Sequence, residues 1–149
     1  MIRIQASVTV NRPLEEVFRF MTDNQNALQW QSGLLEARVT NDVVGVGKTW
    51  VDVVQFLGRR IEVASELTEF EPLRVVGFKS TSGPIPLEGR YAFEPDGEGT
   101  KITFAMQGEA GGFFKLAEPI VARSTQRQWE TNLANLKDLL EQQAPSNEN

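Results

Sequence analysis

Asp52 is an acidic residue within a largely apolar segment, TWVDVVQF at residues 49–56. In an extended chain every second side chain shares a face, so Asp52 lies with Trp50 and Val54. Burial among such neighbours raises the pKa of a carboxyl group and makes Asp52 a candidate general acid or base. The alternative is a slipped register or a strand end, which would leave Asp52 in water.

Tyr91, the only tyrosine, offers a hydroxyl group on a predicted apolar wall. This hydroxyl could hold a ligand carbonyl or act as a weak acid, and the alternative is a core tyrosine that reaches the rim or a water. Gln126 falls within the apolar face of a terminal helix, where its amide needs a partner. That partner could be a ligand, Thr125, a sheet hydroxyl or water, and we favour a structural partner.

The composition excludes several kinds of site. The chain has no Cys and no His, which rules out disulfides, a Cys nucleophile, a Ser–His–Asp triad and any His-ligated metal. The carboxylates form no cluster with metal-ligand spacing, so we expect neither a metal nor another cofactor. Gly45-Val46-Gly47 is read as a turn and not as a phosphate loop, because no helix follows it.

Charge and length limit the partners and the organisation. The net charge is −5 and no stretch concentrates Lys and Arg, so nucleic acid is not an expected partner. The N-terminal segment MIRIQASVTV lacks the apolar run of a signal peptide, and no window resembles a transmembrane span. We therefore expect a cytoplasmic protein without membrane insertion. Its 149 residues predict one domain at residues 1–143 and a disordered tail at 144–149.

One long helix is predicted at residues 119–142, with its only proline in the first turn. It would be about 36 Å long, enough to cross a sheet. Its predicted apolar face, flanked by Thr125 and Leu139, comprises Ala122, Gln126, Trp129, Leu133, Leu136 and Leu140. A one-sided helix of this length needs an apolar partner surface.

The rest of the chain predicts mainly strands. The first, at 2–10, is followed by a helix opened by Asn11-Arg12-Pro13, with Asn11 or Arg12 near the cap, and by a short helix at 26–31. Further strands are predicted at 34–44, 47–57, 60–70, 74–81, 86–94 and 100–108. Short connections imply an antiparallel meander, so we predict an α+β fold in which a curved seven-stranded sheet grips the long helix.

Hairpin registers predict the face that meets this helix, because paired residues share a face. A turn at Gly58-Arg59 pairs Phe56 with Ile61, Val54 with Val63, Asp52 with Ser65, and Trp50 with Leu67. A turn at 95–99 pairs Phe93 with Ile102, Tyr91 with Phe104, and Gly89 with Met106. The turn at 71–74 adds Val76, Phe78 and Ser80 to the same face.

Four segments resemble one known superfamily. They are PLEEVFRFMTDNQNALQWQ (13–31), GVGKTWVDVVQFLGRRIEVASELTEFEP (45–72), YAFEPDGEGTKITF (91–104) and LAEPIVAR (116–123). They resemble the START and birch-pollen-allergen superfamily (SRPBCC), in its polyketide cyclase/dehydrase-like bacterial branch. The resemblance implies a helix-grip fold with an apolar cavity that members use for lipids, polyketides, hormones and other hydrophobic molecules. Its motifs are turn, cap and packing features, so they indicate the fold more than the function.

Thirteen residues are the candidate site. The ligand-binding candidates are Trp50, Val54, Ser65, Phe78, Tyr91, Phe104, Met106, Phe113, Val121, Thr125, Gln126 and Trp129, with Asp52 and Tyr91 as the catalytic candidates. The three tryptophans, Trp30 included, could clamp a flat ligand or simply fill the core, and core packing is our interpretation of Trp30. Phe113-Phe114 could gate the cavity mouth or form a packed turn.

Three functions follow in order of preference. The first is binding or transport of a hydrophobic small molecule, lipid- or polyketide-like, by a monomer or homodimer. The second is a cyclase or dehydratase that shapes an apolar substrate, with Asp52 and Tyr91 handling protons. The third is an interaction protein like the chaperone regulators that share the fold, which predicts a filled core and an exposed apolar patch.

Overall fold

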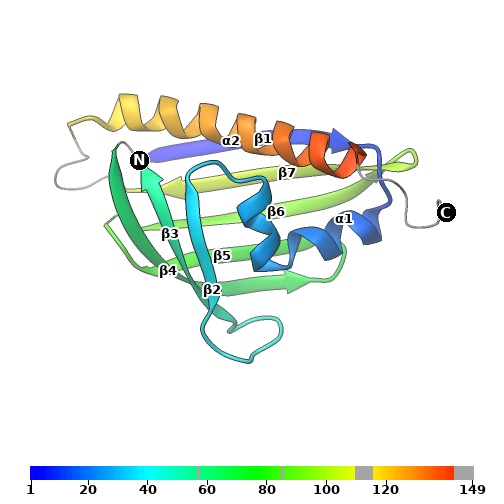
Figure 1. Ribbon diagram of the computed structural model, residues 1–149, viewed down its shortest axis with the longest axis horizontal. Helices are drawn as coiled ribbons and strands as arrows, with labels where there is room; N and C mark the ends of the chain where they lie inside the picture. Colours follow the sequence, from blue (N-terminus) through cyan, green and yellow to red (C-terminus); the bar gives the residue numbers. More distant parts are fainter. Residues whose placement is uncertain (57, 85, 110–115, 143–149) are drawn as a thin grey trace.

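The computed structural model describes residues 1–56, 58–84, 86–109 and 116–142, and confirms the α+β helix-grip fold (Figure 1). The elements are β1 (Ile2–Val10), α1 (Leu14–Met21), the 3₁₀ helix η1 (Asn24–Gln29), β2 (Leu34–Val39), β3 (Thr49–Phe56), β4 (Arg59–Glu71), β5 (Val75–Ser82), β6 (Leu87–Asp96), β7 (Gly99–Gly108) and α2 (Glu118–Gln142). Within the described residues, no helix is both long enough and apolar enough to cross a membrane.

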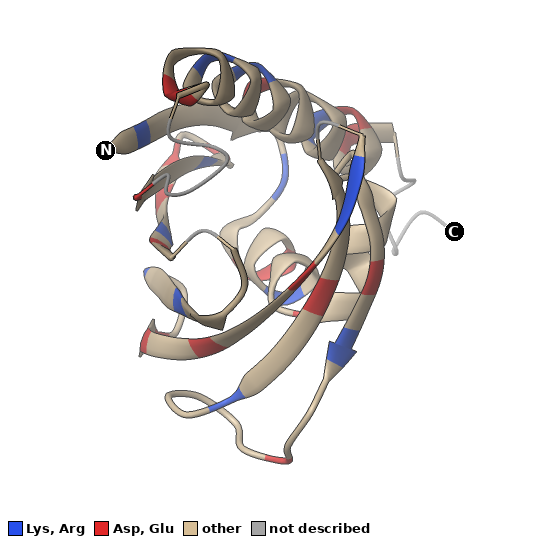
Figure 2. Ribbon diagram, turned by 90° about the vertical axis from the view of Figure 1, so that its left-hand side faces the viewer, with Lys and Arg blue, Asp and Glu red and all other residues tan. Residues whose placement is uncertain are grey.

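The seven strands form one antiparallel sheet in the order β1-β7-β6-β5-β4-β3-β2. The sheet curls beneath α2, which lies beside the edge strand β1 (Figures 1 and 2). The short helices cover another part of the sheet, where η1 packs against β2 and α1 contacts β6 and β7. Helices therefore lie on the concave side of a single sheet, as the excess of apolar strand residues predicts.

The register between β6 and β7 is as predicted, with Tyr91 opposite Phe104. The register between β3 and β4 is not: Asp52 pairs with Val63 and Trp50 with Ser65. Phe56 already pairs with Arg59, so the connection is two residues shorter than the predicted one. Because side chains alternate with period two, a shift of two changes the partners and keeps the predicted inner face.

Smaller corrections concern the segments around the short helices. Asn11 and Arg12 do not cap α1, whose N-cap is Pro13 without a side-chain hydrogen bond. The second short helix begins earlier than predicted, at Asn24, and the Asp23 side chain caps it by accepting a hydrogen bond from Gln25 N. Strand β2 ends at Val39, and the following loop is held by the Asn41 side chain.

The buried face of α2 is rotated in its N-terminal half. Val121 and Thr125 are buried there, whereas the predicted Ala122 and Gln126 are only partly buried. Gln126 turns instead toward the edge strand, where its Nε2 donates to Gln5 O at 2.9 Å and its Oε1 accepts from Gln5 N at 3.3 Å. The amide thereby satisfies backbone groups that β1 would otherwise leave unpaired.

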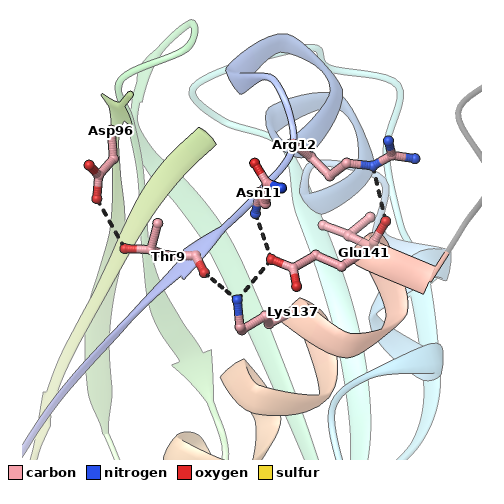
Figure 3. Close-up of polar contacts among 7 residues, drawn as sticks. Thr9, Asn11, Arg12, Asp96, Lys137 and Glu141 are labelled. Carbon is pink, nitrogen blue, oxygen red and sulfur yellow. Dashed lines mark hydrogen bonds and ion pairs between the residues drawn. The ribbon is translucent and has the colours of Figure 1, made fainter. Parts of the chain in front are cut away.

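A polar cluster fastens the other end of α2 to the end of β1 (Figure 3). Lys137 Nζ donates to Thr9 O at 3.0 Å and pairs with Glu141 at 2.8 Å. Glu141 also accepts from Asn11 N at 2.6 Å, and these contacts lower the pKa of its carboxyl group. Arg12 Nε donates to Leu140 O at 3.1 Å, so the segment before α1 is tied to α2.

Candidate functional site

A cavity of about 590 Å³ lies between the inner face of the sheet and α2. One wall follows β3 and the residue before it, where Lys48, Trp50, Asp52, Val54 and Phe56 share one face; Gln55 also contributes near the end of the strand. At the rise of an extended strand, the eight steps from Lys48 to Phe56 span about 26 Å. The cavity is therefore elongated, and its volume is typical of small-molecule sites.

The remaining walls are mostly apolar and come from several elements. Strands β4 to β7 contribute Ile61, Val63, Ser65, Leu67, Phe70, Val76, Phe78, Tyr91, Phe93 and Met106. The helix α2 contributes Val121, Thr125, Gln128, Trp129 and Asn132. A surface of this kind favours a hydrophobic occupant with few polar groups.

Three aromatic rings meet on the cavity wall. The centroids of Trp30 and Tyr91 are 6.4 Å apart, those of Trp30 and Trp129 6.2 Å, and those of Tyr91 and Trp129 6.3 Å. Phe104 is fully buried and does not line the cavity; its ring stacks on that of Trp129, with 4.0 Å between the two centroids. Trp50 contacts Phe78 instead, and among the described residues no ring contact joins it to the other two tryptophans. A clamp of all three tryptophans therefore does not form.

Asp52 and Tyr91 both face this cavity. Burial raises the pKa of Asp52 to about 6, and a hydrogen bond from the Trp50 side chain partly offsets that rise. Burial also raises the pKa of Tyr91, and the negative charge of Asp52 raises it further. At neutral pH the phenol is thus a hydrogen-bond donor, and the same cavity holds a carboxyl group that can exchange a proton.

A second polar group lies where α2 crosses the segment before β2. Asn132 is 2% exposed, and its Oδ1 accepts from Ser32 N at 2.8 Å and from Ser32 Oγ at 3.0 Å. Gln128 Nε2 donates to Ser32 O at 2.8 Å. Sequence reasoning missed these residues, because nothing in a helix pattern shows that a loop about 100 residues earlier supplies the partner.

Lys48 was also missed, although a signal for it was present. It directly precedes β3 and shares the face of Trp50 and Asp52 by the same alternation. Its Nζ donates to Asn24 Oδ1 at 2.7 Å. Lys48 lies at one end of the cavity, and η1 and the loop between β2 and β3 form that end.

The structure brings most of the predicted site residues together. Those on the cavity wall are Trp50, Asp52, Val54, Ser65, Phe78, Tyr91, Met106, Val121, Thr125 and Trp129. Phe104 lies behind Trp129, and Gln126 faces β1, so neither lines the cavity. Phe113, Phe114 and the tail at 144–149 lie outside the described residues. Within the described part of the chain, no group of acidic residues is placed to hold a metal ion.

A curved antiparallel sheet that holds a long C-terminal helix over an apolar cavity defines a START-like helix-grip protein. The chain belongs to the family described as polyketide cyclase/dehydrase and lipid transport, whose model matches residues 1–141. The resemblance inferred from the sequence is thereby confirmed. No curated protein sequence matches the chain.

Solved structures share the fold at low sequence identity. The protein TTHA0849 from Thermus thermophilus has a TM-score of 0.83 and 22% identity, covering 95% of this chain and 99% of that one. A START superfamily protein from Mycobacterium smegmatis has a TM-score of 0.82 and 14% identity over 95% and 99%. The ZhuI aromatase/cyclase from Streptomyces sp. R1128 has a TM-score of 0.80 and 15% identity over 93% of each chain.

Proposed function

We propose that this protein binds or carries a hydrophobic small molecule, lipid- or polyketide-like, in the cavity between its sheet and α2. The observation that carries this proposal is the mainly apolar, elongated cavity of about 590 Å³. Burying apolar ligand surface there is favourable at roughly 25 cal/mol per Å². The family description, which names lipid transport beside polyketide cyclases, supports the same class of ligand.

The test is direct binding by the whole chain. Native mass spectrometry of protein purified without delipidation should show a bound apolar molecule, and the neutral probe N-phenyl-1-naphthylamine should bind with a rise in fluorescence. Val54→Trp places an indole in the cavity and should weaken probe binding at least about tenfold. Val51→Trp, on the other face of β3, is the matched control and should bind as the wild type does. Failure of every apolar probe to bind the wild type would overturn the proposal.

A cyclase or dehydratase activity in the same cavity is the second candidate. The observation that favours it is that Asp52 and Tyr91, two groups able to exchange or donate protons, both line the cavity. Tyr91 would donate a hydrogen bond to a substrate carbonyl while Asp52 removes a proton from the adjacent carbon. One protein with the same fold, from Streptomyces, is an aromatase/cyclase, so the fold is compatible with this chemistry.

This activity can be separated from binding alone. Exchange of the α-protons of an apolar ketone with D₂O, followed by NMR, should be faster with the wild type than with Asp52→Asn or Tyr91→Phe. Equal exchange rates with all three proteins, when the ketone is shown to bind, would contradict the enzymatic activity and leave binding or transport as the function. The interaction-protein alternative requires a filled core, and the cavity counts against it.

A further inference from the structure

Lys48 differs from the other basic residues in its surroundings. Of the described Lys and Arg residues, only Arg12, Lys48 and Lys137 are not exposed. Arg12 pairs with Glu16 at 3.1 Å and Lys137 pairs with Glu141 at 2.8 Å. Among the described residues, no carboxylate lies within 4.0 Å of Lys48 Nζ, whose hydrogen bond goes to the neutral amide of Asn24. Within the described part of the chain, Lys48 is thus a partly buried cation without a counterion.

A charge in this position is unfavourable unless something compensates it. Partly buried charges in proteins are usually paired, because the removal of water is costly and an opposite charge offsets that cost. An ammonium group has three N–H donors, and Asn24 Oδ1 accepts only one. Two donors of Lys48 therefore remain available for an anion, and the cavity that Lys48 lines has room for one.

The rest of the cavity fixes how an anionic ligand would lie. Lys48 is the only basic residue among the described residues that line it. Asp52 lies four residues further along β3, about 13 Å away at the rise of a strand. Its carboxyl group would repel an anion placed deeper in the cavity, while Val54 and Phe56 beyond it offer apolar surface. Asp42, in the loop between β2 and β3, also lines the cavity and is exposed to solvent.

We propose that the ligand is an amphipathic molecule with an anionic head, such as a long-chain carboxylate, whose head group pairs with Lys48. Its apolar tail extends along β3 past Trp50 and Val54 toward Phe56. The inference rests on the proposed function, because the tail needs the cavity that the carrier function assigns. It adds a defined chemical class and a direction of binding.

The experiment compares an acid with an uncharged analogue of the same chain length. Dodecanoate and methyl dodecanoate each displace N-phenyl-1-naphthylamine from the wild type and from variants at pH 8. The wild type should bind dodecanoate about tenfold more tightly than the ester, as expected for a charge-assisted hydrogen bond. Lys48→Met should abolish this preference, and Lys48→Arg should keep it. Lys79→Met, which removes the same charge from an exposed position on β5, should also keep it.

Each outcome decides a separate point. Equal binding of acid and ester by the wild type overturns the inference and leaves the carrier function intact, because both ligands still displace the probe. A preference that persists in Lys48→Met, with probe affinity unchanged, assigns the head group to another cation and also overturns it. If neither ligands nor probe bind, the carrier function fails, and the inference fails with it. If Lys48→Met does not fold, loss of the preference in Lys48→Gln with retention in Lys48→Arg supports it.

Discussion

The two halves of α2 differ in what lies beneath them. In the C-terminal half, Leu133, Leu136 and Leu140 are at most 1% exposed and belong to the same close-packed core as Val10 and Ile102. Toward the N-terminal end, five residues of α2 line the cavity: Val121, which also belongs to that core, Thr125, Gln128, Trp129 and Asn132. One amphipathic helix therefore fills the core at one end and forms a cavity wall at the other. The comparison suggests that the cavity is encoded by a few residues, chiefly the polar Thr125 and Asn132, where close packing would need aliphatic side chains.

Truncation in the two halves should have unequal effects. Leu136→Ala should lower the free energy of unfolding by about 2–5 kcal/mol, because it creates a new void in a close-packed region. Val121→Ala should cost less, since it enlarges a cavity that already exists. Urea unfolding followed by tryptophan fluorescence measures both values. Equal losses at the two positions would show that the N-terminal half is packed as closely as the C-terminal half.

Asp52 should make the free energy of unfolding depend on pH. Its pKa is 3.8 ordinarily and about 6 in the folded protein, so ionisation costs the folded state about 3 kcal/mol above pH 6. The cost is absent below pH 3.8, where both states hold the proton, and grows as the pH rises through this interval. Asp52→Asn removes it.

The measurement is urea unfolding of the wild type and Asp52→Asn at several values between pH 4 and pH 8. The stability of the variant relative to the wild type should rise by up to about 3 kcal/mol across this range. Glu62→Gln, at an exposed position on the other face of the neighbouring strand β4, controls for the loss of one carboxylate. A difference that does not change with pH would place Asp52 in bulk water.

Filling the cavity should reverse the usual effect of a core mutation. Thr125→Leu replaces a buried polar side chain on the cavity wall with a larger apolar one. We expect a gain of about 0.5–2 kcal/mol in stability together with weaker probe binding. Thr125→Val, which removes the hydroxyl at nearly constant size, separates the two causes. Loss of stability in Thr125→Leu would mean that this part of the wall cannot accept added volume.

The sequence allowed the sheet and most of the cavity wall to be predicted, for a simple physical reason. Alternation along a strand places Trp50, Asp52 and Val54 on one face whatever their partners, so a register error of two residues did not matter. Helical periodicity is less decisive, because a residue at the border of the face can turn to either side. Gln126 has that position, and only the structure shows that it meets an edge strand.

The polar partners of Asn132 and Lys48 could not be predicted for a different reason. Their roles depend on partners distant in sequence, Ser32 for Asn132 and Asn24 for Lys48, and no local pattern identifies such partners. Lys48 lacks the carboxylate partner that Arg12 and Lys137 have in the described part of the chain, and this difference depends on tertiary contacts. Long-range polar contacts are thus the part of this site that needed coordinates.

Two glutamines on α2 test whether the contacts of this helix with the edge strand β1 are independent of its contacts at the cavity. Gln126 bonds the backbone of Gln5 in β1, while Gln128 bonds Ser32 O and lines the cavity. Gln126→Ala should lower the stability by about 0.5–1.5 kcal/mol, the usual net value of such bonds, and leave probe affinity unchanged. Gln128→Ala should cost about as much and also alter probe affinity, because it changes the wall and loosens Ser32. If Gln126→Ala changed probe affinity as strongly, contacts with the edge strand would control the cavity, and the two sides of α2 would be one coupled unit.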